Sequence, residues 1–118
     1  AEGLRVFREL LPAALPEDDD EVDFATGFAP ELMDIGIESI FGRLWTREGL
    51  SKRDRSLVTL GILIALRADD ELEAHFQIAR NNGLTDAELA EVIYHASGYA
   101  GFPAANTARN IAARALGV

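Results

Sequence analysis

Glu71 and His75 are the residues whose types and spacing best suit acid–base chemistry in this sequence. They stand four positions apart, so on a helix both side chains lie on one face and can share a hydrogen bond. A carboxylate beside an imidazole fixes its tautomer and stabilises its protonated form, which suits a proton donor. The alternative is a core histidine whose bond to Glu71 is structural, and the spacing leaves both interpretations open.

His95 and Tyr99 form a second set of candidates. The neighbours of His95 are mostly small, which is typical of a pocket wall or of close packing, and no nearby group marks the ring as catalytic. This favours the packing interpretation for His95. Tyr99 comes just before a predicted helix break at residues 101–103, where its phenol either reaches into a cleft or packs the break.

Residues 43–55 are basic, with five bases against two acids, in a chain that is otherwise acidic. Such a run is usually a solvated face, but guanidinium groups also bind carboxylates through two parallel hydrogen bonds. Arg53 and Arg55 stand out because they open a helix whose N-terminus itself attracts anions. Trp45, the single tryptophan, is interpreted as an anchor at a helix or subunit junction, with ligand contact as the alternative.

Composition limits the classes of protein to which the chain can belong. Its 118 residues, 48% of them apolar, predict one domain over residues 1–118. The absence of cysteine excludes disulfides, thiolate nucleophiles and cysteine-ligated metals. A net charge of −9 and a pI near 4.6 disfavour binding to nucleic acid or anionic membranes. We therefore expect a cytoplasmic protein with a small-molecule partner.

Several known sites have no counterpart in the sequence. There is no glycine-rich dinucleotide motif, no P-loop, no zinc-protease motif and no serine-hydrolase elbow. The two histidines stand twenty residues apart and do not by themselves predict a metal site. The longest apolar stretch, residues 57–66, is shorter than the roughly 20 residues of a membrane helix, and no signal peptide is recognisable.

The hydrophobic periodicity predicts an all-α fold of about six helices. Residues 1–29 would form a short helix and an acidic loop, in which six of the seven residues from 17 to 23 are acidic, and residues 30–118 the helical core. Thr85 and Glu88 form a capping box, and Asp69 or Asp70 is expected to cap the preceding helix. The helix over 51–67 is apolar on nearly all sides, which predicts the most buried element. The predicted helices span residues 4–11, 30–43, 51–67, 70–81, 86–100 and 103–116.

From Phe41 onward the order of features resembles the carboxymuconolactone decarboxylase family. The resemblance covers about residues 40–118 and rests on FGRLWTREGLSKRDRSLVTLGILIAL followed by DELEAHFQIARNNGLTDAELAEVIYHASGYAGFPAA. The alkylhydroperoxidase branch of that superfamily carries a Cys-x-x-Cys pair at the positions of Ala68 and Glu71. This chain has neither cysteine, so it is similar to the decarboxylase branch, and peroxiredoxin chemistry is not expected of it.

The resemblance implies a function that the residues alone do not. It implies cofactor-free loss of CO2 from 4-carboxymuconolactone, in aromatic catabolism, by a homotrimeric or homohexameric ring. It raises the catalytic interpretation of His75 with Glu71, and the expected substrate has two carboxylates. Tyr99 is then a further catalytic candidate, and the expected substrate-binding residues are Arg53, Arg55, Trp45 and His95. The alternative is a non-catalytic helical oligomer that binds a small carboxylate or scaffolds a partner.

Overall fold

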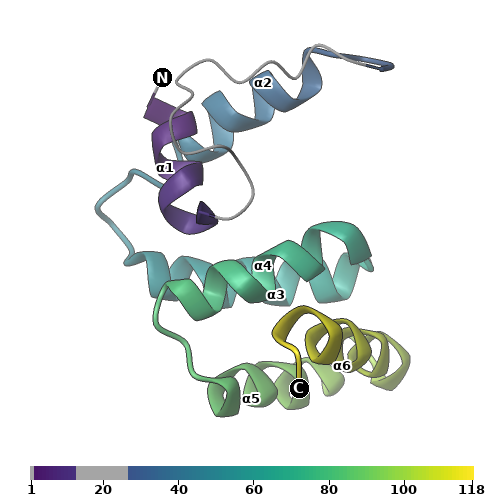
Figure 1. The fold of residues 1–118 in the computed structure, drawn as a ribbon. Coiled ribbons are helices and arrows are strands. Elements are labelled where there is room, and N and C mark those ends of the chain that lie inside the picture. The colour runs from purple at the N-terminus through teal and green to yellow at the C-terminus, as the bar shows by residue number, and fades with distance from the viewer. Residues whose placement is uncertain (1, 13–26) are drawn as a thin grey trace. The chain divides into compact units, whose positions relative to one another are not determined.

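The computed structural model describes residues 2–12 and 27–118, and all regular structure in these residues is helical (Figure 1). The all-α prediction is therefore confirmed. The chain separates into two compact units, Ala1–Leu50 and Ser51–Val118. The predicted acidic loop at residues 17–23 lies outside the described residues, and the assignment of one domain to residues 1–118 stays a prediction.

The first unit contains α1 (Glu2–Leu10), α2 (Leu32–Gly36) and a π-helical turn, η2 (Ile37–Phe41). The predicted helix over 30–43 thus begins at Leu32 and widens at its centre, where the Gly42 N–H donates to the Ile37 carbonyl five residues back at 3.0 Å. The α1 backbone lies directly against this turn. A Cβ atom on Gly3 would stand 2.1 Å from the Ile37 carbonyl oxygen, so only glycine fits there.

The second unit contains α3 (Lys52–Leu66), α4 (Asp69–Asn81), α5 (Asp86–Ser97) and α6 (Phe102–Leu116). Its core draws on all four helices, with Phe76 fully buried at the centre of α4. Burial of such apolar side chains is the main driving force for this packing. The core side chains are Leu60, Ile64, Leu72, Phe76, Ala79, Leu84, Leu89, Ile93, Ala104, Ala105, Ala108, Ile111 and Ala112.

The helix ends in this unit follow local sequence signals, with one exception. The Thr85 hydroxyl accepts from the Glu88 N–H at 3.1 Å, and Glu88 accepts from the Thr85 N–H at 3.0 Å, which confirms the capping box. The prediction that Asp69 or Asp70 caps α4 is wrong. Ala68 occupies that position without a side-chain bond, and both aspartates lie in the first turn, where carboxylates favour the helix dipole.

The prediction that residues 51–67 form the most buried helix is also wrong in a single copy of the chain. In α3 only Ser56, Leu60 and Ile64 are buried. The side chains of Val58, Ile62 and Leu66 are 54%, 52% and 69% exposed. The other helices of the unit pack against one side of α3, so an apolar sequence on all sides leaves apolar surface uncovered.

Candidate functional site

An open groove of about 630 Å³ lies on the second unit between α3 and α5. Its walls are mainly apolar, with Leu57, Gly61 and Ala65 on the α3 side and both small and large residues on the α5 side. Three of the predicted site residues, Arg53, His95 and Tyr99, line it together. The other lining residues are Leu84, Glu88, Glu91, Val92, Ala96 and Ala100.

His95 and Tyr99 lie one helical turn apart beside this groove. Their ring centroids are 5.2 Å apart and the rings are inclined by 31°. The Tyr99 side chain is 87% exposed, so the pair forms a surface rather than an enclosed pocket. The rings offer a flat face for stacking and two groups able to form hydrogen bonds, but no buried donor.

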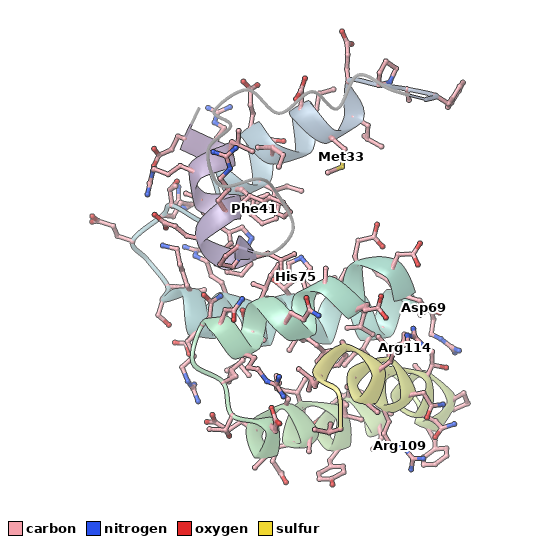
Figure 2. All side chains as sticks on the ribbon, viewed as in Figure 1. Met33, Phe41, Asp69, His75, Arg109 and Arg114 are labelled. Carbon is pink, nitrogen blue, oxygen red and sulfur yellow. The ribbon has the colours of Figure 1, made fainter. Side chains whose placement is uncertain are left out.

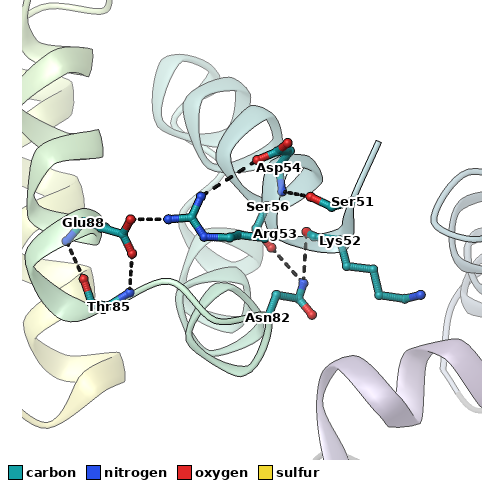
Figure 3. A network of polar contacts seen from close by, with 8 residues as sticks. All are labelled: Ser51, Lys52, Arg53, Asp54, Ser56, Asn82, Thr85 and Glu88. Atoms are coloured by element: carbon teal, nitrogen blue, oxygen red, sulfur yellow. Dashed lines mark hydrogen bonds and ion pairs between the residues drawn. The ribbon is translucent and has the colours of Figure 1, made fainter. Parts of the chain in front are cut away.

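Arg53 is held at one end of the groove by carboxylates of the protein itself (Figure 3). Its guanidinium donates to Glu88 Oε2 and lies 3.9 Å from an Asp54 oxygen. The Thr85 backbone N–H and, to a lesser extent, Arg53 hold the pKa of Glu88 below its usual value. With Glu91 also in the wall, this groove carries more acid than base and is a poor receptor for a doubly charged anion.

Asn82 belongs to the same polar network. The sequence did not indicate a structural role for this residue. Its side-chain amide donates to Ser56 Oγ at 3.0 Å and to the Lys52 carbonyl at 3.3 Å (Figure 3). Ser56 is 1% exposed, so this bond satisfies a buried hydroxyl. The pair Asn82-Gly83 is typical of a helix end, but no feature of the sequence predicts a hydrogen bond from Asn82 to α3.

Glu71 and His75 lie one turn apart on α4, as predicted, and Figure 2 shows His75 on this helix. Neither residue lines the groove. The imidazole is partly buried, and burial lowers the pKa of His75 below its ordinary value. The Glu71 carboxylate acts in the opposite direction and raises the pKa, as the sequence analysis expected, but desolvation is the larger effect. A partly buried imidazole with a shifted pKa beside a carboxylate is a candidate acid–base group.

Trp45 and Arg55 are the remaining predicted site residues, and neither lines the groove. Trp45 is 5% exposed in the first unit, and its ring stacks on Phe41 with centroids 6.3 Å apart. Phe41 in turn meets Phe7 edge to face at 4.9 Å, so Trp45 belongs to an aromatic cluster, which agrees with the anchor interpretation. Arg55 lies partly buried in the first turns of α3. The proposed contact of each with a substrate stays a prediction.

Two searches of the described residues gave negative results. Among residues 2–12 and 27–118, no three or more histidine, aspartate and glutamate side chains gather where they could hold a metal ion. In the same part of the chain, no helix has the length and apolar character needed to cross a membrane.

Comparison with known proteins shows that the chain is similar to decarboxylases. A model of the carboxymuconolactone decarboxylase family matches residues 30–114. Over 72 residues, 61% of this chain, it is 49% identical to 4-carboxymuconolactone decarboxylase of Acinetobacter baylyi, and it covers 54% of that relative. It is 36% identical over 102 residues to nitrosuccinic acid decarboxylase of Metarhizium robertsii, covering 86% of this chain and 70% of the relative.

Proposed function

The chain belongs to the carboxymuconolactone decarboxylase family, and from this we propose that it removes CO2 from a small carboxylated lactone or a related acid without a cofactor. The observation that carries the proposal is the family match over residues 30–114, which includes every proposed site residue. The names of two relatives specify different acids. We take 4-carboxymuconolactone as the first substrate to test because its decarboxylase is the more similar of the two.

The reaction requires the protein to stabilise a developing negative charge and to donate a proton. When the carbon–carboxylate bond breaks, its electron pair enters the conjugated lactone and forms a dienolate, so negative charge develops on the lactone oxygen. Cationic or N–H donors aimed at that oxygen would lower the barrier. A carbon atom of the dienolate must then receive a proton, which restores a neutral lactone ring and completes the balance.

His75 is the proposed proton donor and Glu71 its partner. Desolvation lowers the pKa of His75, so the imidazole of the free protein is mostly neutral at neutral pH. An anionic substrate close to the ring would raise that pKa, because the opposite charge favours imidazolium. Substrate binding would therefore be coupled to uptake of the proton that the dienolate later receives. Tyr99 and His95 are the second candidates for this role.

Arg53 and Arg55 are the proposed ligands of a substrate carboxylate. Arg53 is engaged by Glu88, so a substrate carboxylate would have to compete with that ion pair. Both arginines lie near the N-terminus of α3, where the helix dipole favours an anion. His95 remains a proposed substrate-binding residue of the second unit, and Trp45 a separate proposal in the first.

We also propose that the chain works as a closed cytoplasmic trimer or hexamer in aromatic catabolism. The support for assembly is the exposed apolar surface, which includes the outer side of α3 and the apolar side chains of α2, a helix in which no residue is buried.

The experiment that tests the activity is incubation of the full chain with 4-carboxymuconolactone and, separately, with nitrosuccinic acid, followed by measurement of CO2 release. Turnover of the lactone supports the proposal in full, and turnover of the second acid alone changes the substrate. Binding of either acid in calorimetry without CO2 release would contradict catalysis and support the alternative of a carboxylate-binding oligomer.

A further inference from the structure

One side chain, that of Asn82, ties the start of α3 to the end of α4 (Figure 3). Its amide nitrogen donates to the Ser56 hydroxyl and to the Lys52 carbonyl, across 26 and 30 positions of the sequence. The two acceptors stand one helical turn apart on α3, and Arg53 and Arg55 lie between them in the sequence. The amide therefore holds the segment of α3 that carries both proposed carboxylate ligands.

Packing alone does not require the bond between Asn82 and Ser56. Ser56 is the one buried polar side chain in the part of the chain that the structure describes, and it lies on the same side of α3 as the buried Leu60 and Ile64. An alanine there would fill nearly the same space and would have no hydroxyl in need of a partner. Apolar contacts have no direction, whereas a hydrogen bond does, so this pair fixes how α3 is placed on α4.

Helix α4 also carries the proposed proton donor. His75 precedes Asn82 by seven residues, which is about 10 Å along the helix at 1.5 Å per residue. Because the helix is regular between them, the point at which Asn82 holds α3 also sets how far the start of α3 lies from His75. Such spacing matters for a reaction, since a displacement of about 1 Å can lower a rate by about 10²-fold.

We propose that Asn82 is a positioning residue for the decarboxylation, which fixes the start of α3 on α4 and so sets the place of Arg55 relative to His75. Arg53 is less dependent on this bond, because Glu88 on α5 holds its guanidinium separately. The inference rests on the proposed function, in which Arg55 binds a substrate carboxylate and His75 donates the proton.

Steady-state kinetics on 4-carboxymuconolactone test this role. Asn82→Ala removes both hydrogen bonds and should raise KM by about three- to ten-fold, because the bond from Arg55 to the carboxylate is weakened. A smaller folded fraction would lower kcat and leave KM unchanged, so KM separates positioning from loss of fold. Ser56→Ala removes only one of the two bonds and should raise KM less. An unchanged KM in Asn82→Ala overturns the proposal.

Gln77→Ala is the matched control. The Gln77 amide also lies on α4 and donates to a backbone carbonyl, that of Ala115 on α6, at 3.2 Å. The substitution thus removes a bond of the same kind that does not reach α3, and KM should stay within about two-fold of wild type. An equal rise of KM in Gln77→Ala and Asn82→Ala contradicts a specific role for Asn82.

A second background tests whether Asn82 acts through Arg55. When Arg55→Met is already present, Asn82→Ala should raise KM by less than about two-fold further, because the group that it positions is gone. Independent effects on binding would add in free energy, so KM would then rise by the same factor in both backgrounds. That result assigns Asn82 a role in which Arg55 has no part and overturns the proposal.

Hydrogen exchange tests the tie without turnover. Amides of residues 55–59 should exchange faster in Asn82→Ala than in wild type, while those of residues 63–66 at the other end of α3 stay unchanged. Uniform acceleration along α3 would show general destabilisation and contradict the proposal. If the wild type binds the lactone without releasing CO2, the proposed function fails, and the Kd of the lactone replaces KM in the same comparisons. The two failures are therefore distinguishable, and a chain that neither binds nor converts the lactone overturns both.

Discussion

Glu88 joins the starts of α3 and α5 through its two carboxylate oxygens. Oε2 accepts from the Arg53 guanidinium on α3, and Oε1 accepts from the Thr85 N–H at the start of α5 at 3.0 Å (Figure 3). One side chain thus closes a capping box and bridges two helices. This carboxylate holds the two helices together at the end of the groove. Protonation of Glu88 would remove its negative charge and so weaken both hydrogen bonds.

The bridge predicts how stability depends on pH. The pKa of Glu88 is lowered in the folded chain, so its contribution is present above the unfolded value of 4.5 and is lost as the pH falls through the lower folded value. Glu88→Gln can still accept from Thr85 but cannot titrate. Its free energy of unfolding, measured in urea, should lie below wild type near neutral pH and converge with it in acid. Two parallel curves would contradict this role.

Substitution of each histidine tests which one donates the proton. His75→Gln keeps a similar size and a polar group near Glu71 but removes the titratable proton, so kcat should fall by about 10²–10⁴-fold with the helices intact. His95→Gln is the matched control, since it makes the same change in the groove, and should keep kcat within a few-fold. Stopped assays on the lactone, with circular dichroism, measure both. The reverse pattern would assign the proton to His95.

The pH dependence of the rate gives an independent prediction for His75. Burial lowers its pKa below 6.5 in the free protein, so an essential imidazolium is lost as the pH rises through that lower value. The rate constant kcat/KM should fall across this range. The corresponding fall in kcat should lie at higher pH, because bound anionic substrate raises the pKa. A kcat/KM that stays level from about pH 5 to pH 8 in wild type would exclude a titrating histidine.

Local interactions explain which parts of the fold could be predicted from the sequence. The Thr85 and Glu88 capping box involves residues three positions apart, so its signal is complete within one helical turn. The helix start at Ser51 is of the same kind, because its hydroxyl accepts from the Asp54 N–H at 3.0 Å. The start of α4 was predicted wrongly because Asp69, Asp70 and Glu71 follow one another, and the sequence does not show at which of them the helix begins. The N-cap position is occupied by Ala68.

Contacts between distant residues explain what the sequence could not predict. The apolar pattern of α3 shows that all its sides could be buried, but not which other helices pack against them. In the structure one side of the helix is exposed. The site residues also divide in space in a way that spacing does not reveal. His95 and Arg53 line one groove, where Arg53 pairs with Glu88, 35 positions further along the chain. His75 lies on another helix and outside this groove.

The two arginines of α3 should differ in their effect on the reaction. Arg55→Met should raise KM by about ten-fold or more, because loss of a charged hydrogen bond to a bound carboxylate costs about 1.5–3 kcal/mol. Arg53→Met should mainly lower the free energy of unfolding, because it breaks the bridge to Glu88. Steady-state kinetics and urea unfolding of both variants distinguish the two roles. A larger KM effect in Arg53→Met would move the carboxylate site into the groove.

Close contact between α1 and η2 predicts an unusual sensitivity at Gly3. In Gly3→Ala the new Cβ would stand 2.1 Å from the Ile37 carbonyl oxygen, so one backbone must move, at a cost of about 1–3 kcal/mol. Gly36→Ala is the matched control, because a Cβ there meets nothing within 4 Å and alanine favours helix by about 0.5–1 kcal/mol. Hydrogen exchange of amides in α1 and η2 should therefore accelerate in the first variant and slow or stay unchanged in the second. Equal protection in both variants would mean that the helices do not meet at Gly3.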